Sequence, residues 1–494
     1  MSTISHTFTR LQKRLSRLGI ESSYADQIYH LKKGGAKEEI KSEIKGEIQG
    51  KIEGDITADV LLPESLPLEE KAVQQLLNFA SVRVPGHEGR VCHARATPDF
   101  HPGTVAPVGS IVATTPDLAI PAAIGTDINC GMRLFSTGMA YPEACGQQTE
   151  LLAQLKKVLL EDQRNVPVTP ASFQALFDEG LGAWLDELPA QGLWQHVDFK
   201  RLHSELGAIL GADTINAHSR YAPEAFFEKR DIMRPPSLGT VGSGNHFVEL
   251  QVVDTILDRH LAYQAGLHQG DVVVMIHTGS RDVGFYVGQR WQDRAKALWP
   301  ATEKYPASGL FGLTDEDAQS YLLAMGVAAR YAWANRIVLT EMVRNVWQQV
   351  FKQDESSLLV DISHNIILPE HGMNIHRKGA TPAHEGDLAL IPGSMGDYSY
   401  VVAGQGNADW LWSCSHGAGR SVRRQAMRGN KAQRQNAQRQ DSLLPWQCIT
   451  LKDERLREEA PAAYKPVTPV IEVQEQAGLI RGVVRLRPWV TFKA

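Results

Sequence analysis

Short apolar segments that end in glycine-rich, polar turns are the feature that most constrains the fold of this chain. Three of them read DVVVMIHTGSR, SLLVDISHN and DLALIPGSMGDYSY, and they begin at residues 271, 357 and 387. Apolar runs of this length predict buried strands, and the glycines mark the turns that follow them. Because binding and catalytic side chains often lie in such turns, we expect a site built at the ends of strands.

A long helix is predicted over residues 314–351. Thr314 can cap it, the acidic residues Asp315 to Asp317 suit its first turn, and an alanine-rich periodic stretch follows. Strands and long helices are mixed without a regular βαβ repeat, and neither GxGxxG nor GxxxxGKS/T occurs. The sequence therefore predicts an α+β fold with a single large, irregular catalytic domain rather than a Rossmann fold or a barrel.

Charge and composition exclude several classes of protein. The 494 residues carry 51 Lys and Arg against 56 Asp and Glu, a net charge of −5, so the chain is not a polycation. Five scattered cysteines without a CxxC pair indicate a reducing compartment rather than a disulfide scaffold. No apolar run approaches the roughly 18 residues of a membrane span, and the first twenty residues lack the apolar core of a secretory signal. We expect a soluble, cytoplasmic protein with no membrane partner.

The first eighty residues differ from the rest, and we predict a charged N-terminal extension over residues 1–80 and a catalytic domain over residues 81–494. Between Glu39 and Val60 an EIKG-like pseudo-repeat places isoleucine at every fourth position from Ile40 to Ile56. On a helix these isoleucines would form an apolar stripe that drifts around the axis, and on a strand they would all lie on one face. The pattern is compatible with either structure. A solvated appendage and an arm that docks RNA or a partner both remain open.

Five residues have side chains that could bind metal ions. Asp127 and Cys130 lie three apart in IGTDINCGMRL, His246 lies in GTVGSGNHFVE, and His277 and His364 follow apolar segments. Each could also be an ordinary turn or core residue. Thiolate and imidazole suit zinc or iron, whereas a carboxylate with open water positions suits manganese or magnesium. Five donors exceed one tetrahedral site, but a thiolate that bridges two ions would use them all.

His416 is the candidate nucleophile. It lies in SCSHGAGR, where the small residues that follow leave room for a nucleotide, and Cys414 is a rival two positions away. The glycine turns around Asn245 and Ser394 could hold phosphate. Residues 420–439, which we call the basic segment, contain seven cations and no acidic residue, and this favours phosphate binding. The cations are Arg420, Arg423, Arg424, Arg428, Lys431, Arg434 and Arg439.

Taken together, the motifs resemble those of the RtcB RNA ligases. PDFHPG, GTDINCGMRL, GSGNHFVE, IHTGSRDVG, SHN, HRKGAT, IPGSMGDYSY, SCSHGAGR, EAPAAYK and VRLRPWVTFK occur in the family's order, over roughly residues 83–494. The resemblance implies an RtcB-type catalytic domain that joins an RNA 3′-phosphate or 2′,3′-cyclic phosphate to a 5′-hydroxyl, as in RNA repair or tRNA splicing. A guanylyl-capping enzyme and an inactive RNA-binding relative are the alternatives.

The resemblance also implies cofactors and residue roles. GTP and two Mn²⁺ ions are expected, with Cys130 bridging one ion held by Asp127 and His246 and another held by His277 and His364. His416 would carry GMP. The expected partners are RNA and, as a candidate, an archease-type activator, and the chain is expected to be a monomer or a weak dimer. The expected nucleotide contacts are Asn245, His246, Phe247, Val248, Glu249, His364, Asn365, Pro392, Gly393, Ser394, Met395, Ser399, His416, Gly417, Ala418, Gly419 and Lys493.

One departure from the common pattern lies near the expected nucleotide site. Asp397 follows IPGSMG where the family usually has a small or hydroxyl residue. We expect this extra carboxylate to alter the affinity for phosphate.

Overall fold

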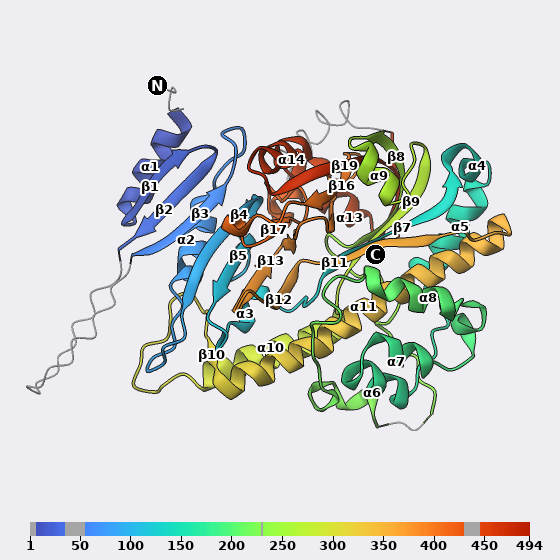
Figure 1. Ribbon diagram of the computed structural model, residues 1–494, viewed down its shortest axis with the longest axis horizontal. Helices are drawn as coiled ribbons and strands as arrows, with labels where there is room; N and C mark the ends of the chain where they lie inside the picture. The colour runs from blue at the N-terminus through green and yellow to red at the C-terminus, as the bar shows by residue number, and fades with distance from the viewer. Residues whose placement is uncertain (1–5, 35–54, 229–230, 429–444) are drawn as a thin grey trace, which may run out of the picture.

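Two large β-sheets and one long helix organise the protein in a computed structural model that describes residues 6–34, 55–228, 231–428 and 445–494 (Figure 1). The first sheet has seven strands in the order β1-β2-β3-β4-β5-β13-β12, antiparallel except for the pair β3 and β4. Its strands are β1 (Ile20–Ala25), β2 (Ile28–Lys33), β3 (Ile56–Leu61), β4 (Val91–His101), β5 (Val108–Thr114), β12 (Asn365–Glu370) and β13 (Met373–Lys378).

The second sheet has eight strands. Its order is β11-β7-β9-β8-β19-β16-β15, and β18 pairs in parallel with β19. The central strand β9 is buried from Val272 to Thr278, and its β-branched residues suit this position. The strands are β7 (Gly131–Ala140), β8 (Phe247–Ile256), β9 (Asp271–Thr278), β11 (Ser357–Ser363), β15 (Leu388–Ile391), β16 (Ser399–Gly404), β18 (Gln447–Thr450) and β19 (Ile480–Lys493).

Two short ribbons complete the strand pairing of the described residues. One joins β6 (Leu118–Ala119) to β10 (Leu313–Thr314). The other joins β14 (Ala380–Pro382) to β17 (Ser413–Ser415), so it brings the residue after β17 beside the residue before β14.

The predicted long helix is confirmed as α11 (Asp315–Phe351), which crosses the molecule beneath the sheets in Figure 1. It is buried on nearly all sides through its middle, as expected of a helix surrounded by other elements. Thr314 occupies the N-cap position, but its side chain makes no capping hydrogen bond. The other α-helices are α1 (His6–Arg17), α2 (Glu70–Ala80), α3 (Pro121–Ile124), α4 (Tyr141–Cys145), α5 (Gln148–Leu159), α6 (Pro170–Asp178), α7 (Leu181–Asp186), α8 (Phe199–Glu205), α9 (Arg259–Gln264), α10 (Arg281–Ala297), α13 (Asp453–Glu458) and α14 (Val467–Gln476).

The hydrophobic core has two main parts, one on each face of the second sheet. Residues of α5, α6, α10 and α11 pack together with Val248 and Ile276 on one face. Residues of α9 and α14 pack with Met275 and Val401 on the other face. This layered mixture of helices and largely antiparallel sheets confirms the predicted α+β class.

The described residues before position 81 are packed against the rest of the chain. β3 pairs with β4, and Leu15, Leu31 and Val60 share one core with Phe100 and Val112. Most of the pseudo-repeat, residues 39–54, lies outside the described residues, but its last isoleucine, Ile56, begins β3. The division of the chain at residue 80 stays a prediction.

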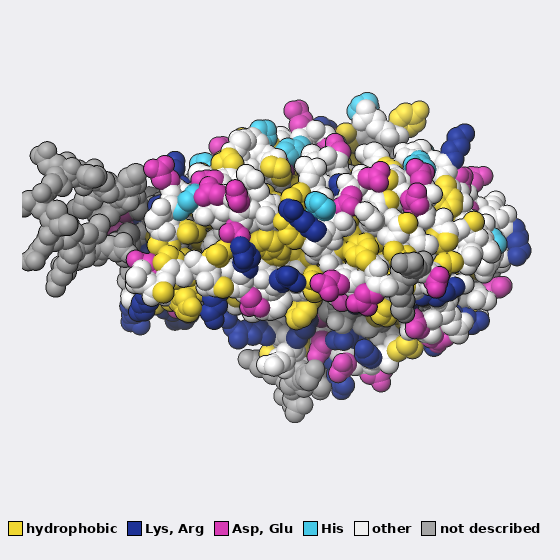
Figure 2. Space-filling model, turned by 90° about the horizontal axis from the view of Figure 1, so that it is seen from below, with side chains coloured by type: hydrophobic (Ala, Val, Ile, Leu, Met, Phe, Trp, Pro, Cys, Tyr) yellow, Lys and Arg dark blue, Asp and Glu magenta, His cyan; other side chains and the backbone are white. Residues whose placement is uncertain are grey.

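No helix in the described part of the chain is both long and apolar enough to cross a membrane. On the face that Figure 2 shows, basic and acidic side chains are interspersed. This mixture agrees with the nearly balanced charge of the sequence.

Candidate active site

The strand order of the second sheet explains why four residues distant in the sequence meet. Cys130 and His246 come directly before β7 and β8, whereas His277 lies at the end of β9 and His364 directly follows β11. Because β7 and β8 run antiparallel to β9, and β11 runs antiparallel to β7, these four positions lie at one edge of the sheet. The predicted location of these four side chains at the ends of strands is confirmed.

The structure brings the five predicted metal-binding residues together as a compact group, the five-donor cluster. The Sγ atom of Cys130 lies 3.2 Å from Nε2 of His246 and 3.3 Å from Nε2 of His277. Nε2 of His277 is 3.2 Å from Nε2 of His364, and Nε2 of His246 is 2.9 Å from Oδ2 of Asp127. The donors form two groups of three that share Cys130.

A glycine makes this approach possible. A Cβ atom at Gly279, two residues after His277, would lie 2.2 Å from Oδ1 of Asp127. Any other residue at this position would push the carboxylate away from the cluster.

Burial shifts the pKa values of two histidines and the cysteine of the cluster. It holds the pKa values of His277 and His364 well below the usual range, and neighbouring histidines add to the effect. Neutral imidazole is the form that binds metal. Burial also raises the pKa of the Cys130 thiol, and Asp127 adds to this. Since two cations would favour the thiolate, and the donors divide into two sets of three with a shared sulfur, the cluster fits a pair of metal ions.

His416 lies beside this cluster and is held by a buried carboxylate. It directly follows β17, and its ring centroid is 4.6 Å from that of His364. Its Nδ1 is 2.6 Å from Oδ2 of Asp99, whose other oxygen accepts a 2.6 Å hydrogen bond from the Thr97 hydroxyl. With Nδ1 engaged, Nε2 is the nitrogen left for chemistry. Burial opposes ionisation of Asp99, but the contact with His416 keeps the pKa of this carboxyl below its usual value.

The glycines after His416 have a specific role. Gly419 adopts a φ of +76°, and a Cβ atom there would lie 2.3 Å from the carbonyl oxygen of Asp99. The GAG sequence thus lets the turn after His416 pack directly against the strand that carries Asp99.

Cys414, the rival nucleophile, is poorly placed. Its side chain is fully buried and lies 3.1 Å from the Thr381 hydroxyl. Burial raises the pKa of this thiol to about 12, so the reactive thiolate is scarce near neutral pH.

A cavity of about 580 Å³ connects the cluster, His416 and most of the predicted nucleotide contacts. Val248 points away from it into the core, and His246 and Ser399 are not on its wall. Ser399 instead supports the wall, since its hydroxyl accepts hydrogen bonds from Gln251 at 3.0 Å and from the Gly393 amide at 3.4 Å. The predicted contacts that line the cavity are Asn245, Phe247, Glu249, His364, Asn365, Pro392, Gly393, Ser394, Met395, His416, Gly417, Ala418, Gly419 and Lys493.

Comparison with known proteins identifies the chain. The family model described as tRNA-splicing ligase RtcB matches residues 75–494. The chain belongs to the RtcB family. A tRNA-splicing ligase RtcB of Thermococcus kodakarensis is 33% identical over 480 residues, which cover 85% of this chain and 90% of that protein. One of Archaeoglobus fulgidus is 32% identical over 85% of this chain and 90% of its own length. One of Pyrococcus horikoshii is 35% identical over 73% of this chain but only 44% of its own, longer sequence.

The structure of this RtcB family member corrects the interpretation of the basic segment. Two of its cations do have a counter-charge, because Glu459 pairs with Arg420 at 3.0 Å and with Arg424 at 2.8 Å. The sequence pattern missed this because Glu459 lies outside the segment. Arg423 is exposed and lines the cavity. Residues 429–444, including Lys431, Arg434 and Arg439, lie outside the described residues.

Asp397 has a structural task that its sequence position did not reveal. One carboxylate oxygen accepts a hydrogen bond from the Tyr398 amide at 2.8 Å, and the other accepts one from the Val467 amide, in the first turn of α14, at 3.4 Å. Its expected effect on phosphate affinity stays a prediction.

Three cavity or support residues escaped the sequence analysis. Asp99 lies within the PDFHPG motif, which marked it only as part of a turn-rich stretch. Lys465, in EAPAAYK, is buried and donates hydrogen bonds to the carbonyl oxygens of Pro98 and Phe100, at 3.0 and 2.7 Å, so it fixes the segment around Asp99. Glu69, within the predicted extension, lines the cavity.

Proposed function

We propose that this protein is a GTP-dependent RNA ligase that uses two Mn²⁺ ions to join an RNA 3′-phosphate or 2′,3′-cyclic phosphate to a 5′-hydroxyl. One observation carries the proposal: a histidine oriented by a buried carboxylate lines the same cavity as four of the five side chains that could bind metal. Membership of a family whose relatives are named tRNA-splicing ligases supports RNA as the substrate and tRNA splicing as the process.

The Asp99–His416 pair supplies the nucleophile. Asp99 accepts the Nδ1 proton, which leaves the Nε2 lone pair free to attack the α-phosphorus of GTP. A P–N bond forms and pyrophosphate leaves. Asp99 also stabilises the positive charge that the imidazole carries in the adduct, as a buried carboxylate does for a catalytic histidine.

The five-donor cluster would hold the two ions, with Asp127, Cys130 and His246 on one and Cys130, His277 and His364 on the other. Bound there, the ions would neutralise charge on the phosphate oxygens. The chain itself keeps the imidazoles of His277 and His364 neutral by burial and places the shared sulfur between the two sets.

The second half of the reaction uses the same cavity. GMP passes from Nε2 of His416 to the RNA 3′-phosphate, so that a phosphate oxygen replaces nitrogen on the GMP phosphorus. A cyclic phosphate is first hydrolysed to the 3′-phosphate. The 5′-hydroxyl then attacks the activated phosphate, a new phosphodiester forms, and GMP is the leaving group.

The test is incubation of the protein with Mn²⁺, GTP labelled at its α-phosphate, and a cleaved RNA stem-loop with 3′-phosphate and 5′-hydroxyl ends. We expect a labelled, acid-labile protein adduct, transient GMP-capped RNA and sealed product. Capped RNA that is never sealed would identify a capping enzyme instead. A protein that binds the RNA but forms neither adduct nor product would identify an inactive relative, and either outcome would overturn the proposal.

Three further expectations belong to this proposal. An archease-type activator is a candidate partner, and the protein acts as a monomer or a weak dimer. A cytoplasmic location agrees with five free cysteines.

A further inference from the structure

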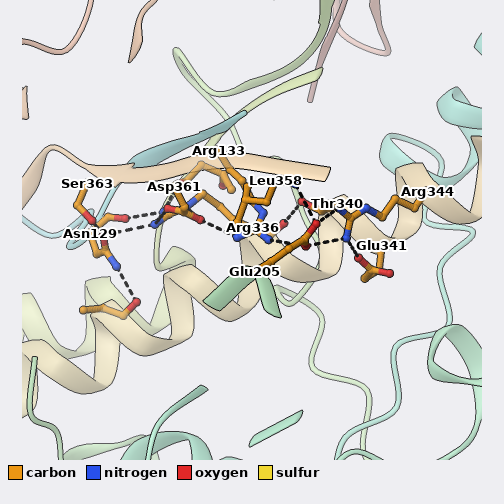
Figure 3. A network of polar contacts seen from close by, with 12 residues as sticks. Asn129, Arg133, Glu205, Arg336, Thr340, Glu341, Arg344, Leu358, Asp361 and Ser363 are labelled. Atoms are coloured by element: carbon orange, nitrogen blue, oxygen red, sulfur yellow. Dashed lines mark hydrogen bonds and ion pairs between the residues drawn. The ribbon is translucent and has the colours of Figure 1, made fainter. Parts of the chain in front are cut away.

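One turn of the buried helix α11 contacts the loops that carry the metal-binding side chains. Asn335 and Arg336 are both fully buried, and they project from α11 toward the edge of the second sheet where the five-donor cluster lies. Figure 3 shows Arg336 within a chain of polar contacts that runs from Asn129 through Asp361 and Glu205 to Arg344.

Arg336 joins the two loops that flank the shared sulfur. Its Nη1 donates hydrogen bonds to the carbonyl oxygens of Asn129, at 2.9 Å, and Thr278, at 3.0 Å. Asn129 directly precedes Cys130, and Thr278 directly follows His277. One guanidinium nitrogen therefore fixes the distance between the backbones that carry these two donors.

Asp361 fixes the guanidinium in turn. Nε of Arg336 donates to both carboxylate oxygens, at 2.9 and 3.0 Å, and Nη2 lies 2.8 Å from Oδ1. Asp361 lies on β11, three residues before His364. Arg336 therefore also contacts the strand that directly precedes a third donor, His364.

Asn335 holds the loop that leads to a fourth donor, His246. Its Oδ1 accepts hydrogen bonds from the amides of Gly239, at 2.7 Å, and Thr240, at 3.2 Å. Its Nδ2 donates to the Thr240 carbonyl oxygen at 3.1 Å. This loop runs on through the glycine turn to His246.

We propose that Arg336 is a positioning residue that sets the separation of Cys130 and His277 and so the geometry of the bound metal pair. The inference rests on the metal centre of the proposed function, but not on the ligation reaction. Arg336 acts through two backbone carbonyls and touches no substrate. Partners behind metal ligands typically change metal affinity by about 10- to 100-fold when they are removed.

The chain offers a matched control on the same helix. Arg344 is also buried, and it pairs with Glu205 at 2.6 Å and with Glu341 at 2.7 Å. Its remaining bond, from Nε, goes to the Ser356 hydroxyl at 2.8 Å. Loss of either arginine removes a buried ion pair, but only Arg336 contacts the loops of the cluster.

The experiment titrates the protein with Co²⁺ alone, in the absence of GTP and RNA, and follows the thiolate-to-cobalt and d–d absorption bands. We expect Arg336→Met to weaken Co²⁺ binding by about 10- to 100-fold and to change the d–d spectrum. Arg344→Met should bind Co²⁺ with the affinity and spectrum of the wild type, even if its thermal stability falls as much. Wild-type affinity and spectrum in folded Arg336→Met would overturn the inference, as would equal losses in both variants.

Arg336→Lys is a second variant for the case in which Arg336→Met does not fold, because it keeps the positive charge beside Asp361. A lysine ammonium lacks the planar fork that serves the carboxylate and two carbonyls at once, so we expect an intermediate loss of affinity and a changed spectrum. A lysine variant indistinguishable from the wild type would overturn the inference. Failure of the proposed function looks different: the wild type would bind two Co²⁺ ions and yet seal no RNA.

Discussion

Oδ2 of Asp99 lies 2.6 Å from Nδ1 of His416, although 317 positions separate the two residues in the sequence. Asp99 is fully buried near the end of β4, and His416 follows β17, so the contact joins the first sheet to the short ribbon of β14 and β17. The contact fixes both the tautomer and the direction of the histidine ring. In the proposed reaction, the reactivity of His416 therefore depends on a residue that no local motif connects to it.

Replacement of Asp99 tests this dependence directly. Asp99→Asn keeps the size of the side chain but loses the carboxylate that orients the ring and stabilises its positive charge. We expect the rate of GMP-adduct formation to fall by about 10²- to 10⁴-fold, as when the orienting carboxylate of a catalytic histidine is lost. The measurement is single-turnover labelling with GTP. Co²⁺ binding should be unchanged, and a wild-type labelling rate would contradict the assigned role.

His416→Ala and Cys414→Ala separate the two candidate nucleophiles. We expect His416→Ala to form no adduct, since it lacks the attacking nitrogen, and to stay folded because the side chain lies on the cavity wall. Cys414→Ala should still form the adduct, with a stability loss of about 1 kcal/mol from the small buried void. Labelling and thermal unfolding of both variants provide the answer. An adduct in His416→Ala would show that another residue carries GMP.

Because Cys130 belongs to both groups of donors, its loss should affect metal binding more than the loss of a donor from one group. Cys130→Ala removes a donor from both groups of three, whereas Asp127→Ala removes one donor from a single group. We expect Cys130→Ala to lose both Mn²⁺ ions and Asp127→Ala to weaken mainly one. Mn²⁺ bound per chain, measured after equilibrium dialysis, distinguishes them. Two tightly bound ions in Cys130→Ala would rule out a bridging thiolate.

Glu459 makes part of the stability of the site depend on pH. Burial alone would raise its pKa, but Lys493, Arg420 and Arg424 lower the pKa to about 2. A carboxyl whose pKa is depressed by folding stabilises the protein above its unfolded value of about 4.3, and this stabilisation is lost as the pH falls toward 2. The stabilisation is at most about 3 kcal/mol.

Glu459→Gln therefore provides a pH-dependent test. At pH 7 the variant should unfold at a lower denaturant concentration than the wild type, because two arginines lose their partner. The difference in the free energy of unfolding should shrink between pH 5 and pH 2. A difference that is constant over this range would show that the carboxylate charge is not the cause.

The grouping of the five side chains could be anticipated from local patterns: Asp127, Cys130, His246 and His277 lie within two residues of a glycine, and His364 follows an apolar segment. Asp99 and Glu459 could not, because their partners come from strands and helices far along the chain. Arg336 was hidden for another reason. In a helix that is buried on nearly all sides through its middle, the apolar pattern gives no sign of which buried arginine contacts a carbonyl.

The contacts of the N-terminal extension could not be predicted from the sequence either. Its pseudo-repeat left a solvated appendage and a docking arm open, and it gave no sign of the pairing of β3 with β4 or of the place of Glu69 on the cavity wall. Sheet order and strand register are set by such long-range contacts.

Arg423 is the described cation of the basic segment that we expect to meet RNA. It lines the cavity and is exposed, whereas Arg420 and Arg424 are engaged with Glu459. Each phosphate contact with single-stranded RNA contributes about −0.7 to the slope of log K against log salt. Arg423→Ala should flatten that slope by about 0.7 and leave GMP-adduct formation intact, because the adduct needs only GTP and metal.

The control is Arg457→Ala, since Arg457 is an exposed cation that is not on the cavity wall. This variant should change neither the salt dependence nor adduct formation. If Arg423→Ala binds RNA with the wild-type salt dependence, the RNA strand approaches His416 from another side of the cavity.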